Sequence, residues 1–237
     1  MIAIPAVDIR GGACVQLVGG SFADERVRIA DAVGAARQWE TLGFKWLHLV
    51  DLDAAVGSGD NAPTIDSILR ESTGAVQVGG GVRSTERARQ LLDAGAASVV
   101  VGTRAIEDPE WVAALATENP GRVIVAADVR ERKLVTHGWA RVQSRDILDL
   151  IADLARLPLG GLLVTAVHLE GQMRGTDLPL MEAVVGASGC PVIASGGVTT
   201  VLDLRALEQR GVAAAVIGMA LYTGALDARA VAQEFKE

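Results

Sequence analysis

The chain has 237 residues, 50% of them hydrophobic and only 3% aromatic, and it carries a formal net charge of −7 at pH 7. A chain of this length can bury a large core, which must here be aliphatic. The negative charge and the lack of a Lys/Arg cluster argue against a nucleic-acid partner, because phosphate backbones are bound by grouped basic residues.

The start of the chain and its cysteines show no sign of export or of a membrane anchor. An apolar strand begins at the first residues, without the basic start and long apolar run of a signal peptide or membrane span. Cys14 and Cys190 are too few for a disulfide framework, and their spacing is not that of metal ligands. We therefore expect reduced thiols in a cytoplasmic protein without a membrane partner.

Apolar segments alternate with amphipathic stretches along the whole chain. The segments that we interpret as strands are Ile2 to Asp8, Trp46 to Asp51, Val76 to Gly79, Ser98 to Gly102, Arg122 to Asp128, Gly161 to Thr165, Val192 to Ser195 and Ala213 to Gly218. Stretches with helical spacing of apolar residues include Ile29 to Leu42, Thr85 to Ala94, Asp146 to Leu154 and Leu202 to Gln209. Continuous apolar runs followed by helices suit parallel strands that are buried on both faces.

The two halves of the sequence resemble each other. AVQVGGGVRSTERARQLLDAGAASVVVGT, from Ala75, aligns without a gap with PVIASGGVTTVLDLRALEQRGVAAAVIGM, from Pro191, at an offset of 116 residues. A weaker match pairs AVDIR with AADVR at an offset of 120. Eight strand-and-helix units with a halfway repeat predict one α/β domain over residues 1–237, a (β/α)8 TIM barrel of two half-barrels, roughly 1–120 and 121–237. An open doubly wound sheet is less favoured, because its glycine turn usually follows the first strand, which here ends in Asp8.

Glycine turns follow four of the predicted strands, in pairs that the repeat relates. They are Gly80 with Gly81, Gly102 with Thr103, Gly196 with Gly197, and Gly218 with Met219. In such a barrel the active site lies at the carboxyl ends of the strands. A strand, a glycine and the start of a helix direct free N–H groups at an anion, so we predict two phosphate sites on opposite sides of the barrel mouth. The alternative is that these glycines merely fit tight turns.

Carboxylates stand at further strand ends. Asp8 and Asp128 occupy repeat-related positions, which suits a general acid and a general base acting on one ligand, and desolvation would raise the pKa of at least one of them. Alternatively, each caps a turn or pairs with a neighbouring arginine. Asp51 either binds a substrate hydroxyl or holds a loop, and we favour the loop. Thr165 hydrogen-bonds the substrate or an Asp, or simply ends a strand.

The remaining polar candidates are single residues. Arg83, beside a glycine triplet, contacts phosphate or substrate, or caps a helix. Trp139 stacks on a flat heterocycle, or packs beneath its own loop. His48, His137 and His168 show no ligand spacing, and we favour structural roles for His48 and His168. We expect no metal.

Seven segments along the chain form a recognisable set: IPAVDIRGG, HLVDLDAA, QVGGGVRS, VVVGTRAIEDP, AADVRE, HGW and IASGGV. With them, the sequence resembles the phosphoribosylformimino-aminoimidazole-carboxamide-ribotide isomerases of histidine biosynthesis over nearly the full chain. The resemblance implies an Amadori rearrangement of an aminoaldose to an aminoketose, on a substrate with two phosphoribosyl groups and without a metal or organic cofactor. It also implies that Asp8 removes the C2 proton of the ring-opened Schiff base, that Asp128 protonates the furanose ring oxygen, and that Thr165 supports this chemistry.

Two positions depart from the family pattern. The family usually has an Asp-Gly-Thr signature where this chain has Glu170, Gly171 and Gln172, so the glycine of that loop is kept while its flanking groups change. We expect Gly171 to contact the substrate still. Gln16 stands where relatives often carry Arg, and we expect the loss of that charge to weaken one contact that some relatives use.

Other functions stay open at this point. A dual-substrate isomerase that also acts on phosphoribosylanthranilate needs basic residues near Trp139, where the chain offers Arg141. A non-catalytic phosphosugar-binding barrel is supported only by the altered loop at Glu170. The cyclase of the same pathway is disfavoured, because its first strand is followed by a catalytic Lys, whereas no Lys precedes Lys45 here. We expect a monomer whose partner is a small bisphosphorylated ribotide.

Overall fold

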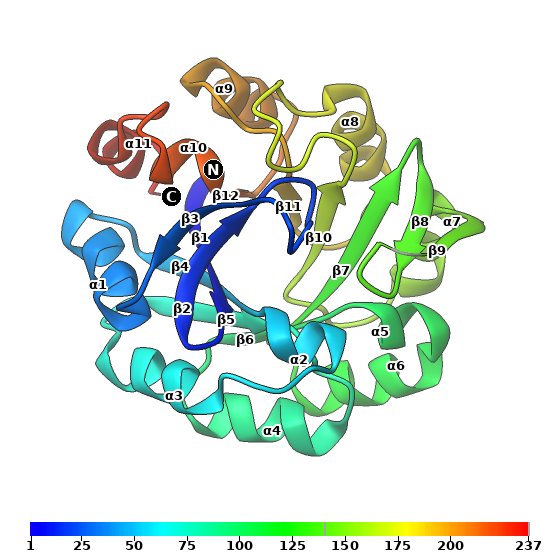
Figure 1. Ribbon diagram of the computed structural model, residues 1–237. Helices are drawn as coiled ribbons and strands as arrows, with labels where there is room; N and C mark the ends of the chain where they lie inside the picture. The colour runs from blue at the N-terminus through cyan, green and yellow to red at the C-terminus, as the bar shows by residue number, and fades with distance from the viewer. Residues whose placement is uncertain (140, 237) are drawn as a thin grey trace.

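The computed structural model describes residues 1–139 and 141–236 and shows parallel strands ringed by helices (Figure 1). Eight of the described strands form the barrel: β1 (Ile2–Arg10), β4 (Trp46–Asp51), β5 (Ala75–Gly79), β6 (Ser98–Val101), β7 (Val123–Arg130), β10 (Gly161–Ala166), β11 (Val192–Ser195) and β12 (Ala214–Ile217). They pair in this order, and β12 returns to β1 to close the ring. The predicted (β/α)8 barrel is confirmed.

Helices follow the strands and cover the outside of the barrel in Figure 1. Those described are α1 (Ala32–Leu42), α2 (Leu52–Val56), α3 (Ala62–Glu71), α4 (Thr85–Asp93), α5 (Thr103–Glu107), α6 (Pro109–Glu118), α7 (Ile147–Leu154), α8 (Leu178–Ala187), α9 (Val201–Gln209), α10 (Met219–Tyr222) and α11 (Ala228–Glu234). In the part of the chain that the structure describes, no helix combines the length and the apolarity needed to cross a bilayer.

Most of the barrel strands are apolar on both faces, because they contribute to two apolar clusters. Alternate residues such as Ile4, Ile124 and Ile193 form the cluster inside the barrel. Their neighbours, such as Val7 and Val125, belong to the larger cluster between strands and helices. Side chains of successive strand residues point to opposite faces, which explains the continuous apolar runs in the sequence.

One predicted helix begins later than its apolar pattern indicated. The stretch from Ile29 is not helical at its start, because Glu25–Ile29 forms strand β3, which pairs with β2 (Ala13–Leu17). Helix α1 begins at Ala32, after Asp31 has capped it by accepting a hydrogen bond from the N–H of Gly34. The other three predicted helices agree with α4, α7 and α9 to within one residue at each end.

Two hairpins at the barrel mouth were not predicted. β2 and β3 follow β1, and β8 (Lys133–Thr136) and β9 (Arg141–Asp146) follow β7. Their registers agree: Asp8 pairs with Val15 in the first half, and Asp128 pairs with Val135 in the second. The repeat therefore extends to the hairpins, although their sequences share little.

Candidate active site

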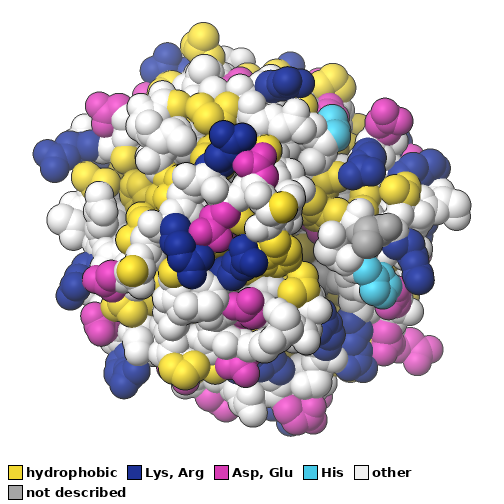
Figure 2. Space-filling model, in the orientation of Figure 1, with side chains coloured by type: hydrophobic (Ala, Val, Ile, Leu, Met, Phe, Trp, Pro, Cys, Tyr) yellow, Lys and Arg dark blue, Asp and Glu magenta, His cyan; other side chains and the backbone are white. Residues whose placement is uncertain are grey.

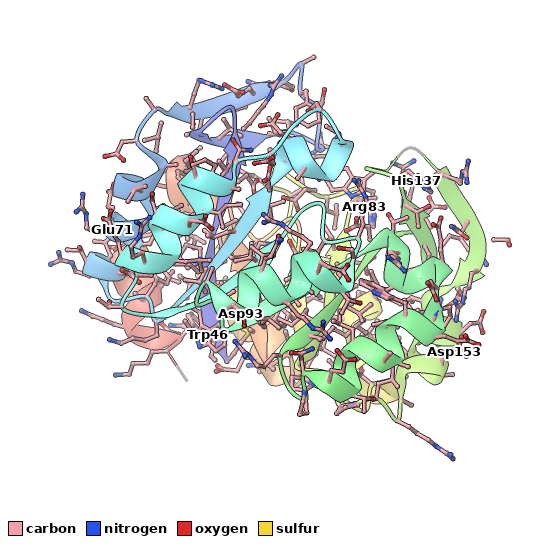
Figure 3. All side chains as sticks on the ribbon, turned by 90° about the horizontal axis from the view of Figure 1, so that it is seen from below. Trp46, Glu71, Arg83, Asp93, His137 and Asp153 are labelled. Carbon is pink, nitrogen blue, oxygen red and sulfur yellow. The ribbon has the colours of Figure 1, made fainter. Side chains whose placement is uncertain are left out.

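The carboxyl ends of the barrel strands surround a cavity of about 310 Å³. The predicted site residues that line it are Asp8, Gly80, Gly81, Arg83, Gly102, Thr103, Asp128, Trp139 and Thr165. In Figure 3, Arg83 and His137 lie at this end of the molecule, whereas Trp46, the first residue of β4, lies toward the other. Figure 2 shows the mouth from outside, with acidic and basic side chains next to one another over the middle of the face. The fold thus gathers residues from both halves into one site.

Asp8 faces the cavity from the end of β1. Its neighbours Val7 and Ile9 are fully buried in the outer cluster, so the alternation of the strand directs the Asp8 side chain inward. Burial raises the pKa of this carboxyl to about 7, because the charged form loses its hydration. A carboxyl with this pKa can take and return a proton at neutral pH.

Asp128 holds the corresponding place at the end of β7. Thr165, its direct neighbour in the pairing of β7 with β10, donates a hydrogen bond to the Asp128 carboxylate, and Trp139 donates a second one. Burial raises the pKa of Asp128, and these two hydrogen bonds act in the opposite direction. Contact with an Asp is one of the roles that the sequence suggested for Thr165.

The tips of the two hairpins meet beside the carboxylates. Trp139 has a positive φ of 70° in the β8–β9 hairpin, and its ring lies so close to Gly20 in the β2–β3 hairpin that a methyl group there would overlap it. The backbone N–H of His137 donates to the Thr103 hydroxyl at 3.2 Å. Trp139 therefore lines the cavity as well as contacting Asp128, and it is more than a packing residue beneath its loop.

The glycine turns of the first half are accompanied by two arginines. Arg83 lines the cavity, and its guanidinium donates to the carbonyl oxygens of Ala54 at 3.2 Å and Ala55 at 2.5 Å, which fixes it against α2. Arg104 also lines the cavity and donates to the carbonyl of Arg83. The sequence interpretation did not single out Arg104, although it directly follows Thr103 in the turn.

The glycine turns of the second half line a separate, much smaller cavity of about 20 Å³. The predicted residues around it are Gly171, Gly196, Gly197, Gly218 and Met219. Glu170 lines this cavity and also the larger one. Burial, together with the charges of the nearby carboxylates Asp8 and Asp128, raises the pKa of Glu170 to about 7. The structure thus places the carboxyl group of Glu170 in the same site as those of Asp8 and Asp128.

Asp51 differs from the other predicted site residues because it lines neither cavity. It is fully buried and is not among the residues that line the two cavities. Its Oδ1 accepts hydrogen bonds from the N–H of Ala54 at 3.0 Å and from Asn61 Nδ2 at 2.7 Å, and its Oδ2 accepts from the N–H of Asn61 at 2.8 Å. These contacts match the loop-holding role that the sequence favoured.

Two further polar residues that were not predicted as site residues, His48 and Ser195, line the large cavity. His48 does so from β4, and burial lowers its pKa to about 4, so its ring is neutral above that pH. Ser195, the last residue of β11, does so from the second half. Ser195 could have been predicted as a site residue, because the sequence places it at the end of a strand.

Known proteins resemble this chain over almost its whole length. A family model described as "Histidine biosynthesis protein" matches residues 2–227. A protein of Gemmatimonas aurantiaca is 60% identical over 235 residues, covering 99% of each chain, and one of Myxococcus xanthus is 57% identical over 236 residues, with the same coverage. One of Methanosphaera stadtmanae is 40% identical over 225 residues, covering 94% of this chain and 95% of its own. All three are named 1-(5-phosphoribosyl)-5-((5-phosphoribosylamino)methylideneamino)imidazole-4-carboxamide isomerase.

Proposed function

This chain belongs to the histidine biosynthesis protein family, and we propose that it catalyses the isomerisation for which its relatives are named, with Asp8 and Asp128 as base and acid. The observation that carries this proposal is the pairing of two half-buried carboxyls with raised pKa values at related strand ends of one cavity. An aldose–ketose rearrangement moves protons between neighbouring atoms, and a positioned carboxyl pair suffices for that chemistry.

The substrate named for the relatives carries two 5-phosphoribosyl groups, one at each end. The site offers two sets of glycine turns to receive them: Gly80, Gly81 and Gly102 in the first half, and Gly196, Gly197 and Gly218 in the second. Free backbone N–H groups at such turns suit phosphate oxygens. The two sets flank the carboxyls, so a substrate held at both ends would present its central sugar to Asp8 and Asp128.

The reaction would proceed by proton transfers alone. Asp128 protonates the furanose ring oxygen, the ring opens to a Schiff base, and the ionised Asp128 keeps the hydrogen bonds from Thr165 and Trp139. Asp8, ionised at the start, then removes the proton from C2, and the resulting enolamine tautomerises to the aminoketose. The roles of base and acid follow the family resemblance, while the hydrogen bonds to Asp128 explain how its anion is stabilised after the first transfer.

The test is steady-state turnover of the purified protein on this aminoaldose and on phosphoribosylanthranilate, side by side and with chelator present. We expect turnover of the aminoaldose alone. Turnover of both substrates would make the protein a dual-substrate isomerase, and turnover of neither would contradict the proposal and favour a phosphosugar-binding barrel.

A further inference from the structure

The two halves of the barrel have equivalent glycine turns, so a comparison of them shows which side chains the turn geometry itself requires. A Cβ on Gly80 would meet the backbone of Asp51, and one on Gly196 would meet that of Ala166; likewise Gly81 packs on Ala54 as Gly197 packs on Leu169. The next residues in each loop correspond as well.

These next residues are Ala55 in the first half and Glu170 in the second. Ala55 lines the large cavity, as Glu170 does. The first-half turn is formed with a methyl group at this place, so the glycine turns do not need a carboxyl group for their own geometry. Glu170 therefore has another role.

The two glycine sites differ in charge. Arg83 and Arg104 line the cavity beside the first-half turns. The residues lining the second-half cavity include no Lys or Arg, and Glu170 is the ionisable one among them. A carboxylate beside a dianionic phosphate in a dry site is unfavourable, because like charges repel strongly where little water screens them.

The Glu170 side chain is well placed to sense an anion. Its Oε2 is shielded from solvent, has no hydrogen-bond partner among the described residues, and lies 3.0 Å from the position that a Cβ on Gly196 would take. The backbone around it is held, since the N–H of Gly19 donates to the Glu170 carbonyl at 3.1 Å. The ionisable groups that act on it across the cavity are Asp8 on β1 and Asp128 on β7, both acidic.

We propose that Glu170 makes anion binding at the second-half glycine turns depend on a proton: the site accepts a dianion when Glu170 is protonated and releases it when Glu170 ionises. The neutral carboxyl can donate its O–H to an anion, whereas the carboxylate can only repel it. The first-half site, with its arginines, keeps its affinity across the same pH range. The inference deepens the proposed function and rests on it for the statement that the anion is a substrate phosphate.

Sulfate is the probe, because its charge stays constant between pH 6 and pH 8. Amide NMR shifts of Gly196, Gly197 and Gly218 report the second-half site, and those of Gly80 and Gly81 report the first-half site in the same titration. We expect the second-half Kd to rise about fivefold between pH 7 and pH 8, as one linked proton with a pKa of about 7 requires, and the first-half Kd to change by less than about twofold. Failure of sulfate to reach the second-half glycines at any pH, or equal pH dependence at both sites, overturns the proposal.

The decisive variant is Glu170→Gln, which keeps the shape of the side chain and removes its titration. Its second-half Kd should stay near the low-pH value of the wild type at every pH, whereas the surface variant Glu110→Gln should behave as the wild type does. A fivefold rise in the second-half Kd from pH 7 to pH 8 that persists in Glu170→Gln overturns the proposal. If that variant does not fold, Glu170→Ala, which installs the first-half residue type, is measured in the same way. Sulfate binding needs no turnover, so failure of this inference and failure of the isomerase assignment are read separately.

Discussion

The two halves of the barrel share a backbone and differ in chemistry. Gly80 and Gly196 have φ values of 89° and 92°, and Gly81 and Gly197 have 70° and 79°, in the left-handed region that suits glycine. Yet the first-half turns open into a cavity of about 310 Å³ that is lined by arginines, and the second-half turns enclose about 20 Å³ beside Glu170. The repeat thus fixes where N–H groups point, and single side chains decide what each end of the site prefers.

The same contrast continues below the mouth. His48, Gln77 and Ser98 occupy paired positions on β4, β5 and β6, and both amide atoms of Gln77 and the Ser98 hydroxyl lack a partner among the described residues. The residues that correspond to Gln77 and Ser98 in the second half are Ile193 and Ala214, both in the apolar inner cluster. Polar groups inside the barrel are concentrated in the first half, under the larger cavity.

The largest expected effect is on turnover, and it tests Asp8 and Asp128, the carboxylates that the two halves have in common. Asp8→Asn and Asp128→Asn should each lower kcat by about 10²–10⁴-fold or more, because each removes one proton-transfer group, while substrate binding is spared. Steady-state kinetics and a binding titration check this. Near-normal turnover in either variant would show that the residue is not a proton-transfer group and that the halves are not functionally paired.

The barrel and much of its mouth could be predicted from the sequence because glycine turns and strand-end carboxylates leave local patterns. The shared glycines predicted the paired turns, and Asp8 and Asp128 were predicted together because AVDIR matches AADVR. The first hairpin was not predicted, because its strand ERVRI is short and alternates in exposure, and its last residue, Ile29, was assigned to the following helix. The place of Glu170 between two cavities depends on how its loop folds over β11, which no local pattern encodes.

Gly102 and Gly218 occupy equivalent positions in the two halves, but the space around them differs. A methyl group on Gly218 would overlap the buried amide oxygen of Gln16, whereas one on Gly102 would meet nothing within 4 Å. Because the overlapping atoms end a side chain that can change rotamer, Gly218→Ala should lower the free energy of unfolding by about 0.5–1.5 kcal/mol more than Gly102→Ala does. Urea unfolding measures both. Gln16→Ala should restore part of the loss in the Gly218→Ala background, and equal costs for the two glycines would refute the steric account.

The two carboxyls should also differ in their effect on stability. The pKa of Asp8 is raised from 3.8 to about 7, so the folded state binds a proton more tightly than the unfolded state does. This contribution to stability is complete below the unfolded pKa and is lost as the pH rises through about 7. Asp8→Asn should therefore raise the free energy of unfolding at pH 8, by about 1–2 kcal/mol after allowance for solvent in the cavity, and raise it less at pH 5.

Asp128→Asn should raise the free energy of unfolding at pH 8 by less than Asp8→Asn does, because it gives up the hydrogen bonds that Thr165 and Trp139 donate to the carboxylate. Urea unfolding at the two pH values makes the comparison. Equal gains for both variants would mean that the hydrogen bonds do not distinguish the two carboxyls.

The smallest expected effect concerns Trp139, which lies in the second-half hairpin and donates a hydrogen bond to Asp128, the proposed general acid. Trp139→Phe removes the indole N–H that lowers the pKa of Asp128, so that pKa should rise further. Because the acid must be protonated to act, the alkaline limb of the kcat/KM profile should move to higher pH, while kcat at neutral pH falls by no more than about tenfold.

The matched control for Trp139→Phe is Trp46→Phe, at the opposite end of the barrel (Figure 3), which should leave the alkaline limb in place. A loss of packing alone would lower kcat without moving the limb, so the position of the limb separates tuning of Asp128 from support of the hairpin. An unmoved limb in Trp139→Phe would assign Trp139 to the hairpin contact with Gly20, and the asymmetry between Asp8 and Asp128 would then rest on Thr165 alone.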